Sequence, residues 1–139
     1  MQFDEYFTEE NKNKIMSEEV NFDLLYNLQK RFQTDECALY TEINSLPVDN
    51  PEMFKYHALF LIEEIGEMIK TDKRWKHYRN DKYDRDDKLS ELADCFICLM
   101  NVCLFSDFTA EEVQKAIVEK IFRNYRRLYN EKQNAQNNN

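Results

Sequence analysis

Residues 52–70 of the chain read EMFKYHALFLIEEIGEMIK, an apolar stretch with a group of glutamates near its end. The apolar side chains recur at helical spacing, and residues three apart, such as Glu64 and Glu67, share one face of a helix. Asn50 and Pro51 precede the stretch and form a helix start signal, a capping side chain followed by proline at the first helical position. The stretch therefore predicts one long helix that carries two carboxylates on one face.

A second stretch, residues 89–105, reads LSELADCFICLMNVCLF and repeats this combination of acids and apolar residues. Helical spacing places Glu91, Asp94, Cys98 and Asn101 on one side of it. Asn101 is the polar residue of an otherwise apolar run, and a buried amide needs hydrogen-bond partners. We expect it either to contact a ligand base or sugar or to serve as an interhelical amide.

The two helices are expected to pack antiparallel, which would bring Glu64, Glu67, Glu91 and Asp94 into one cluster. Carboxylates at close range repel one another and disfavour ionisation. A hard divalent cation with oxygen ligands removes this conflict, and Mg²⁺ is the natural candidate. The pattern therefore indicates a metal site and, by extension, a phosphate-containing ligand.

The rest of the chain indicates an all-α fold, a four- to five-helix bundle. The chain has 139 residues, with one glycine and two prolines, which is typical of long helices with few turns. We expect an N-terminal arm or short helix over residues 1–20, one domain over 21–130 and a disordered polar tail over 131–139. Within the domain, residues 21–46 predict an amphipathic helix with a stripe that includes Leu25, Leu28 and Phe32.

The remaining segments are a connection and a last helix. Residues 71–88 alternate charged and aromatic side chains and predict a mobile connection or a short helix flanked by loops. The last helix begins at Thr109, which with Glu112 forms a capping box. Its apolar stripe consists of Val113, Ile117, Ile121, Tyr125 and Leu128.

Composition excludes several classes of function. A net charge of −8 argues against nucleic acid as a partner. The longest apolar run is too short to span a bilayer, and no leader pattern opens the sequence, so we expect a cytoplasmic protein with no membrane partner. Cys95 and Cys98 resemble half of a zinc site, but without a second pair we expect them to fill a core. The histidines, His57 and His77, lack the Glu-x-x-His spacing of di-iron bundles, and we expect them at the surface or its boundary.

The motif Glu63-Glu64-x-x-Glu67, followed along the chain by Glu91-x-x-Asp94, resembles the signature of the all-α nucleoside triphosphate pyrophosphohydrolases. This superfamily includes MazG-like enzymes, dimeric dUTPases and phosphoribosyl-ATP pyrophosphohydrolase. The resemblance implies that Glu64, Glu67, Glu91 and Asp94 bind Mg²⁺, with Mn²⁺ as a substitute. It also implies that Glu63 or Glu64 activates the water.

The same resemblance suggests substrate-binding residues. Lys120, Asn124 and Arg127 match a basic and polar pattern that contacts phosphates in the family, although the alternative is ordinary surface residues. Lys73-Arg74-Trp75-Lys76 is similar to a segment of the dimeric dUTPase branch, so Trp75 and Lys76 are candidates. Gln29 lies where that branch reads its base, and Asn101 is the remaining candidate.

The resemblance thus predicts Mg²⁺-dependent cleavage of a nucleoside triphosphate, such as dUTP, to the monophosphate and pyrophosphate. One alternative is phosphoribosyl-ATP pyrophosphohydrolase, and another is a catalytically silent helical bundle that binds a partner. The apolar surface of residues 95–105 exceeds what one small bundle covers, so we expect a homodimer or homotetramer. A second subunit could then contribute residues to the site.

Overall fold

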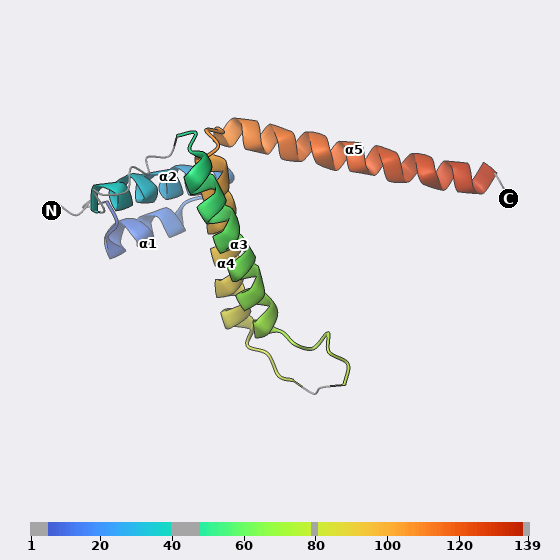
Figure 1. The fold of residues 1–139 in the computed structure, drawn as a ribbon, viewed down its shortest axis with the longest axis horizontal. Coiled ribbons are helices and arrows are strands. Elements are labelled where there is room, and N and C mark those ends of the chain that lie inside the picture. Colours follow the sequence, from blue (N-terminus) through green and yellow to red (C-terminus); the bar gives the residue numbers. More distant parts are fainter. Residues whose placement is uncertain (1–5, 40–47, 79–80, 138–139) are drawn as a thin grey trace.

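The computed structural model describes residues 6–39, 48–78 and 81–137, with only the backbone described for residues 35–39 (Figure 1). Over these ranges the chain forms helices and no strand, which confirms the all-α prediction. The helices are α1 (Glu9–Ser17), α2 (Phe22–Leu39), α3 (Pro51–Thr71), α4 (Arg85–Leu104) and α5 (Ala110–Asn137). No helix in the described ranges is both long and apolar enough to cross a membrane.

Helices α3 and α4 form an antiparallel pair, here called the α3–α4 hairpin, and this is the main packing contact of the molecule (Figure 1). The predicted start of α3 is confirmed, since Asn50 Oδ1 accepts a hydrogen bond from Met53 N at 3.2 Å and Pro51 is the first helical residue. Helix α4 starts earlier than predicted. The Asp84 side chain caps it by accepting a hydrogen bond from the backbone N–H of Asp86 at 2.8 Å. Residues 85–88, which were predicted to be part of the connection, are therefore helical.

The best-buried part of the molecule lies where α2 crosses the end of the hairpin. Phe105, just after α4, is fully buried and stacks on His57 of α3 with ring centroids 5.1 Å apart. The Tyr26 hydroxyl on α2 donates to the carbonyl of Phe108 at 2.6 Å. These contacts fix one end of the hairpin against α2.

The buried face of α2 differs from the predicted apolar stripe. Leu25 and Phe32 are more than two-fifths exposed, whereas Tyr26, Gln29 and Gln33 are buried. The apolar stripe turns instead towards the N-terminal segment, where the rings of Phe32 and Phe7 meet edge to face. The face of α2 that is buried is therefore the one whose glutamines form hydrogen bonds inside the molecule, and not the face with the apolar stripe. Residues 40–46 of this predicted helix lie outside the described ranges.

Helix α5 begins with the predicted capping box. Thr109 N donates to Glu112 Oε2 at 2.7 Å, and Glu112 N donates to Thr109 Oγ1 at 3.2 Å. The first turns of α5 pack on α2, where Gln114 donates to Asp23 at 3.1 Å. Beyond that contact the helix extends away from the rest of the molecule (Figure 1), and residues 115–137, here called the α5 arm, are all exposed.

The predicted apolar stripe of the last helix is largely exposed on the arm, where Ile121 and Tyr125 are 59% and 68% exposed. Residues 131–137, part of the tail predicted to be disordered, continue the helix through Asn137. A helix satisfies its backbone hydrogen bonds locally, so glutamine and asparagine side chains can continue it in solvent.

Candidate metal centre

Three carboxylates converge midway along the α3–α4 hairpin. Glu64 lies on α3, while Glu91 and Asp94 lie one turn apart on α4. Each offers an oxygen atom, and these atoms all lie within 4.8 Å of one another. All three side chains are partly exposed, so the cluster, here called the acid triad, is accessible from solvent. Antiparallel packing of two helices, each with an acid on its inner face, produces this arrangement.

The electrostatics of the acid triad disfavour its charged form. Partial burial raises the pKa of Glu64 above its ordinary value, and the negative charges of Asp94 and Glu91 raise it further. Glu63 and Glu67 add smaller contributions of the same sign. Each cause penalises the charged form of Glu64, and a bound cation would favour that form.

The other two predicted acids do not join this group. Glu67 pairs with Lys70 on the same helix at 2.8 Å, and its oxygen atoms are not part of the triad. Glu63 is exposed and lies beside Glu64 in the sequence. Of the four carboxylates expected to converge, the structure therefore brings together three.

A buried polar network lies in the same seam, nearer the α2 end of the hairpin. Asn101 Oδ1 accepts hydrogen bonds from Gln29 Nε2 at 2.9 Å and from Gln33 Nε2 at 3.2 Å. Asn101 Nδ2 lies 3.4 Å from His57 Nδ1. Two residues predicted separately as substrate contacts, Gln29 and Asn101, thus bind each other, which matches the interhelical reading of Asn101.

His57 is buried on the inner face of α3, and the sequence analysis did not predict this position. It was expected at the surface or its boundary but is only 8% exposed, and burial lowers its pKa. Its Nε2 atom is buried without a hydrogen-bond partner in the described structure. Its position two turns before Glu64 would have placed it on the same inner face. Gln33 lies one turn after Gln29, so helical spacing likewise places it on the same face of α2 as a residue already singled out.

The cysteines behave as core residues. Cys95 and Cys98 are buried in the core, as predicted, and both are free thiols. Burial raises the pKa of both, that of Cys98 to about 11. Both thiols therefore hold their protons more tightly than an exposed cysteine does. The side chain of Cys37 lies outside the described residues.

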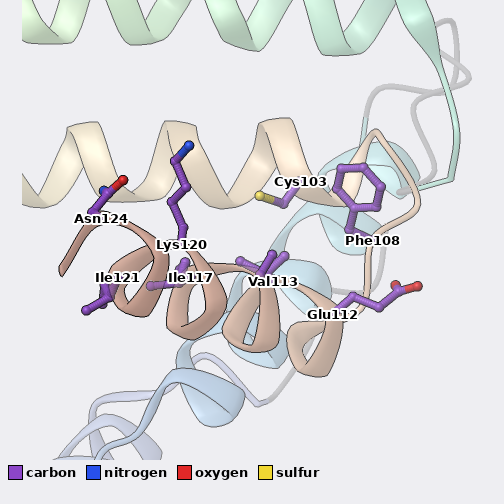
Figure 2. Close-up of a pocket in the computed structure, with 9 residues that line it drawn as sticks. Cys103, Phe108, Glu112, Val113, Ile117, Lys120, Ile121 and Asn124 are labelled. Atoms are coloured by element: carbon purple, nitrogen blue, oxygen red, sulfur yellow. The ribbon is translucent and has the colours of Figure 1, made fainter. Parts of the chain in front are cut away.

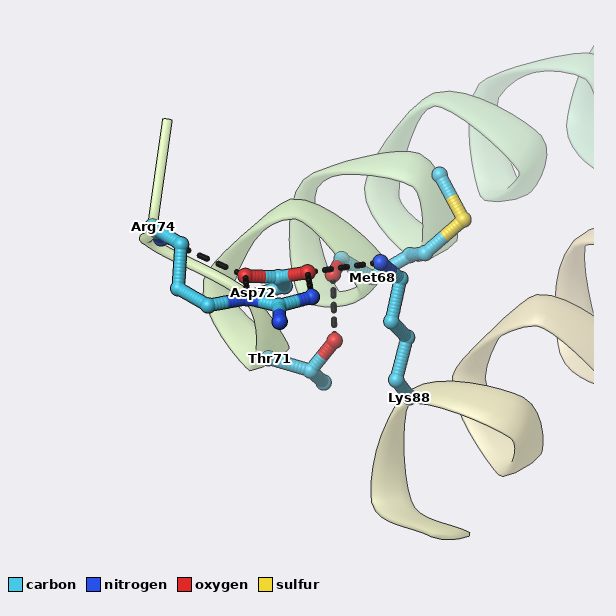
Figure 3. Close-up of polar contacts among 5 residues, drawn as sticks. All are labelled: Met68, Thr71, Asp72, Arg74 and Lys88. Carbon is cyan, nitrogen blue, oxygen red and sulfur yellow. Dashed lines mark hydrogen bonds and ion pairs between the residues drawn. The ribbon is translucent and has the colours of Figure 1, made fainter. Parts of the chain in front are cut away.

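An ion-pair cluster joins the two helices at the open end of the hairpin (Figure 3). Asp72, which ends α3, accepts from Lys88 of α4 at 2.7 Å and binds the Arg74 guanidinium through both carboxylate oxygens at 2.8 Å. These bonds hold the pKa of Asp72 well below its usual range. The cluster borders a cleft of about 540 Å³ that Trp75 also lines.

Of the aromatic and basic candidates in this loop, Trp75 is 59% exposed and Lys76 lies with its Nζ 5.2 Å from the centre of the Trp75 ring. The cleft also includes Met68, one turn beyond Glu64, and Lys88, one turn before Glu91. The cleft that Trp75, Lys88 and Arg74 line therefore begins about one helical turn from the acid triad, towards the open end of the hairpin. Lys88 was not among the residues that the motif resemblance suggested.

The predicted phosphate contacts lie elsewhere. Lys120 and Asn124 extend from the same side of α5 into an open apolar groove of about 600 Å³, which Cys103 of α4 also lines (Figure 2). Arg127 lies further along the arm, with its Nε 3.9 Å from Glu131. No residue of the acid triad lines this groove, and α5 leads away from the hairpin (Figure 1).

Comparison of the chain with known protein families, with curated proteins and with solved structures found no match. The chemistry of the acid triad and of its surroundings is therefore the basis for assigning a function.

Proposed function

We propose that this protein is a Mg²⁺-dependent nucleoside triphosphate pyrophosphohydrolase, which cleaves its substrate to a nucleoside monophosphate and pyrophosphate. The observation that carries the proposal is the convergence of Glu64, Glu91 and Asp94 from two helices within 4.8 Å. A bound divalent cation would offset the repulsion among these carboxylates and use their oxygen atoms as ligands. The order of the acids along the chain also resembles the motif of that superfamily.

The donor set of the acid triad suits Mg²⁺, and Mn²⁺ as a substitute. Mg²⁺ takes oxygen ligands and keeps several of its waters, so few carboxylates are enough to hold it and leave positions for phosphate oxygens. A bound Mg²⁺ would polarise a phosphoryl oxygen and offset the charge of the triphosphate. Glu67 would join this ligand set only by releasing Lys70.

The side chains of the chain supply the remaining steps. Glu63, which is exposed and precedes Glu64 in α3, would orient a water molecule and accept its proton. The water oxygen bonds to the α-phosphorus as the bond from that phosphorus to the bridging oxygen breaks, and pyrophosphate leaves. Lys88 and Arg74, which line the cleft that begins one helical turn from the triad, would attract the departing phosphates. No side chain needs to bond covalently to the substrate.

A second candidate is a catalytically silent helical protein that binds a partner. It is favoured by the pairing of Glu67 with Lys70 and by the internal hydrogen bond between Gln29 and Asn101. Both contacts occupy residues that the enzyme was expected to use. Measurement of catalysis separates the two candidates.

The deciding experiment is pyrophosphate release from a panel of ribo- and deoxynucleoside triphosphates, with dUTP and dCTP included, in Mg²⁺ and in EDTA. Glu64→Gln is the blank, and Glu52→Gln, an exposed acid of the same helix, is the matched control. We expect metal-dependent release that Glu64→Gln lowers by at least about 100-fold, the typical effect of losing an electrostatic catalytic group, while Glu52→Gln retains it.

The preferred base and sugar would then identify the substrate. Phosphoribosyl-ATP belongs in the same panel, because its cleavage in preference to all triphosphates would support the histidine-pathway alternative. A folded protein that binds Mg²⁺ and cleaves none of these compounds would favour the silent helical protein.

A further inference from the structure

Two apolar surfaces of the same chain are left without a partner. The first is the α5 arm, on which Ile121, Phe122 and Tyr125 are 59–68% exposed. The second is the side of the hairpin that carries the acid triad, where Phe60, one turn before Glu64, is 38% exposed and Ile97, one turn after Asp94, is 37% exposed. Monomeric proteins rarely leave continuous apolar surfaces of this kind in water.

The two surfaces carry opposite charge. The hairpin side holds the acid triad with Glu63 and Glu67 next to it. The arm is a basic segment of a chain that is acidic as a whole, with Lys115, Lys120, Arg123, Arg126, Arg127 and Lys132 against Glu119 and Glu131. The apolar and basic α5 arm is therefore complementary in charge to the acid-triad side of the hairpin, which is apolar and acidic. This complementarity favours the association of the two surfaces.

Within one chain the two surfaces cannot meet in the observed arrangement. Lys120 lies ten residues into α5 and Asp94 lies ten residues before the end of α4, so each is about 15 Å from the junction of the two helices. From that junction the helices diverge (Figure 1). The arm would reach a hairpin without rearrangement only if that hairpin belonged to another copy of the chain.

The area available is sufficient for a stable dimer. Residues 115–128 of the arm form about 21 Å of helix, and one side of such a helix offers roughly 350 Å². Each docked arm covers a similar area of the hairpin beneath it. Because the exchange is reciprocal, two arms and two hairpins together would bury roughly 1,400 Å², within the usual size range of a specific protein interface.

We propose that two copies of this chain exchange their α5 arms, so that the arm of each lies along the acid-triad side of the other's hairpin. Each arm then brings Lys120, Asn124 and Arg127 to the acid triad of its partner. Their role as phosphate contacts there rests on the proposed function, whereas the exchange itself rests on the shape, charge and exposure of the two surfaces.

The exchange is tested first by light scattering coupled to size exclusion, which is independent of activity. The wild type is expected to have twice the mass of the chain. Ile121→Glu on the arm and Ile97→Glu on the hairpin should each give a monomer that keeps its helical circular dichroism. Two variants add the same charge outside the proposed interface: Asn130→Glu on the polar side of the arm, and Leu92→Glu on the far side of α4, where Leu92 is also 37% exposed. Both should stay dimeric.

Other outcomes would overturn the exchange. A wild-type monomer would mean that the surfaces stay open or that the arm folds back on its own hairpin. Dissociation by Ile121→Glu but not by Ile97→Glu would indicate arm-to-arm pairing. Dissociation by Leu92→Glu but not by Ile97→Glu would place the interface on the far side of α4.

A second experiment locates the arm, with Mn²⁺ as the probe. ¹⁵N-labelled Glu64→Gln/Glu91→Gln protein, which lacks the metal ligands, is mixed with unlabelled wild type and allowed to exchange subunits. Mn²⁺ bound to the wild-type triad should broaden the labelled amide signals of residues 120–127. The labelled variant without wild type should show no such broadening. Its absence in the mixture, while labelled wild type shows broadening around Glu64, would overturn the exchange.

Activity measurement then separates the exchange from the proposed function. Glu64→Gln and Lys120→Ala/Arg127→Ala are each expected to be inactive, but their equimolar mixture should regain about a quarter of wild-type activity, since half of the dimers contain one intact site. If the mixture exchanges subunits but regains no activity, Lys120 and Arg127 act in the site of their own chain, which would contradict the proposal. If the wild type neither broadens around Glu64 nor cleaves a triphosphate, the proposed function fails, while light scattering still decides the exchange.

Discussion

At the scale of the residue, the main unbalanced charge is that of Glu64. Burial and the charges of Asp94 and Glu91 raise its folded pKa above the ordinary value of 4.5. The folded protein therefore holds the proton more tightly than the unfolded chain. Without metal, this contribution to stability is fully present below pH 4.5 and is lost as pH rises through the folded pKa.

We therefore expect Glu64→Gln to become increasingly more stable than the wild type as pH rises from 4.5 in EDTA. The glutamine carries no charge to be repelled by the neighbouring acids. Urea unfolding of both proteins at several pH values measures the difference, with Glu52→Gln as a control for the loss of one acid from the same helix. A difference between Glu64→Gln and wild type that stays constant with pH would contradict the prediction.

Asn101 provides a second test at this scale. Asn101→Ala would leave the side-chain amides of Gln29 and Gln33 buried without their acceptor. We expect the free energy of unfolding to fall by about 2–4 kcal/mol, the cost of stranding two buried polar groups. Denaturant unfolding measures it, and Asn27→Ala, an exposed asparagine on α2, is the control. A variant with wild-type stability and a raised KM would mean that Asn101 serves the substrate instead.

At the scale of the element, the ends of the helices are where sequence and structure agree best. Asn50 with Pro51 and Thr109 with Glu112 start α3 and α5 where the sequence predicted. Such caps are formed by residues three positions apart, so the local sequence specifies them. The start of α4 was predicted too late, because Asp84 is followed by charged residues and the apolar pattern begins only at Leu89.

The Asp72 cluster gives a prediction for the hairpin as an element. Asp72→Asn removes the charge that holds Lys88 and Arg74, so the last turn of α3 and the first turn of α4 should separate more often. We expect severalfold faster cleavage by trypsin after Lys73 or Arg74, measured under native conditions. Lys115→Met, which removes an exposed ion pair within α5, is the control and should leave this rate unchanged.

Acid should have a similar effect on the wild type. The ion pairs depress the folded pKa of Asp72 below its ordinary value of 3.8. The stability that it contributes is therefore present above pH 3.8 and is lost as pH falls through the folded pKa. If the cleavage rate of Asp72→Asn equals that of the wild type, the cluster does not hold the hairpin closed.

At the scale of the molecule, metal binding should be visible as stability. A ligand that binds only the folded state at ten times its Kd adds about 1.4 kcal/mol, or roughly 3–6 °C in Tm for a chain of this size. We expect this Mg²⁺-dependent rise in the wild type and its loss in Glu64→Gln and Asp94→Asn. Glu67→Gln should keep most of the rise, because Glu67 is engaged with Lys70. An equal rise in all four proteins would show that Mg²⁺ acts elsewhere.

The sequence alone determined the helical class, the two acid-bearing helices and the caps of α3 and α5, because all of these depend on contacts within one or two helical turns. The tertiary structure decided which of those side chains meet. It brings Glu64 to Glu91 and Asp94 while Lys70 holds Glu67 away, it joins Gln29 to Asn101, and it directs α5 outwards. These outcomes depend on competition between partners that are distant in sequence, and helical periodicity specifies the face of a helix but not its neighbour.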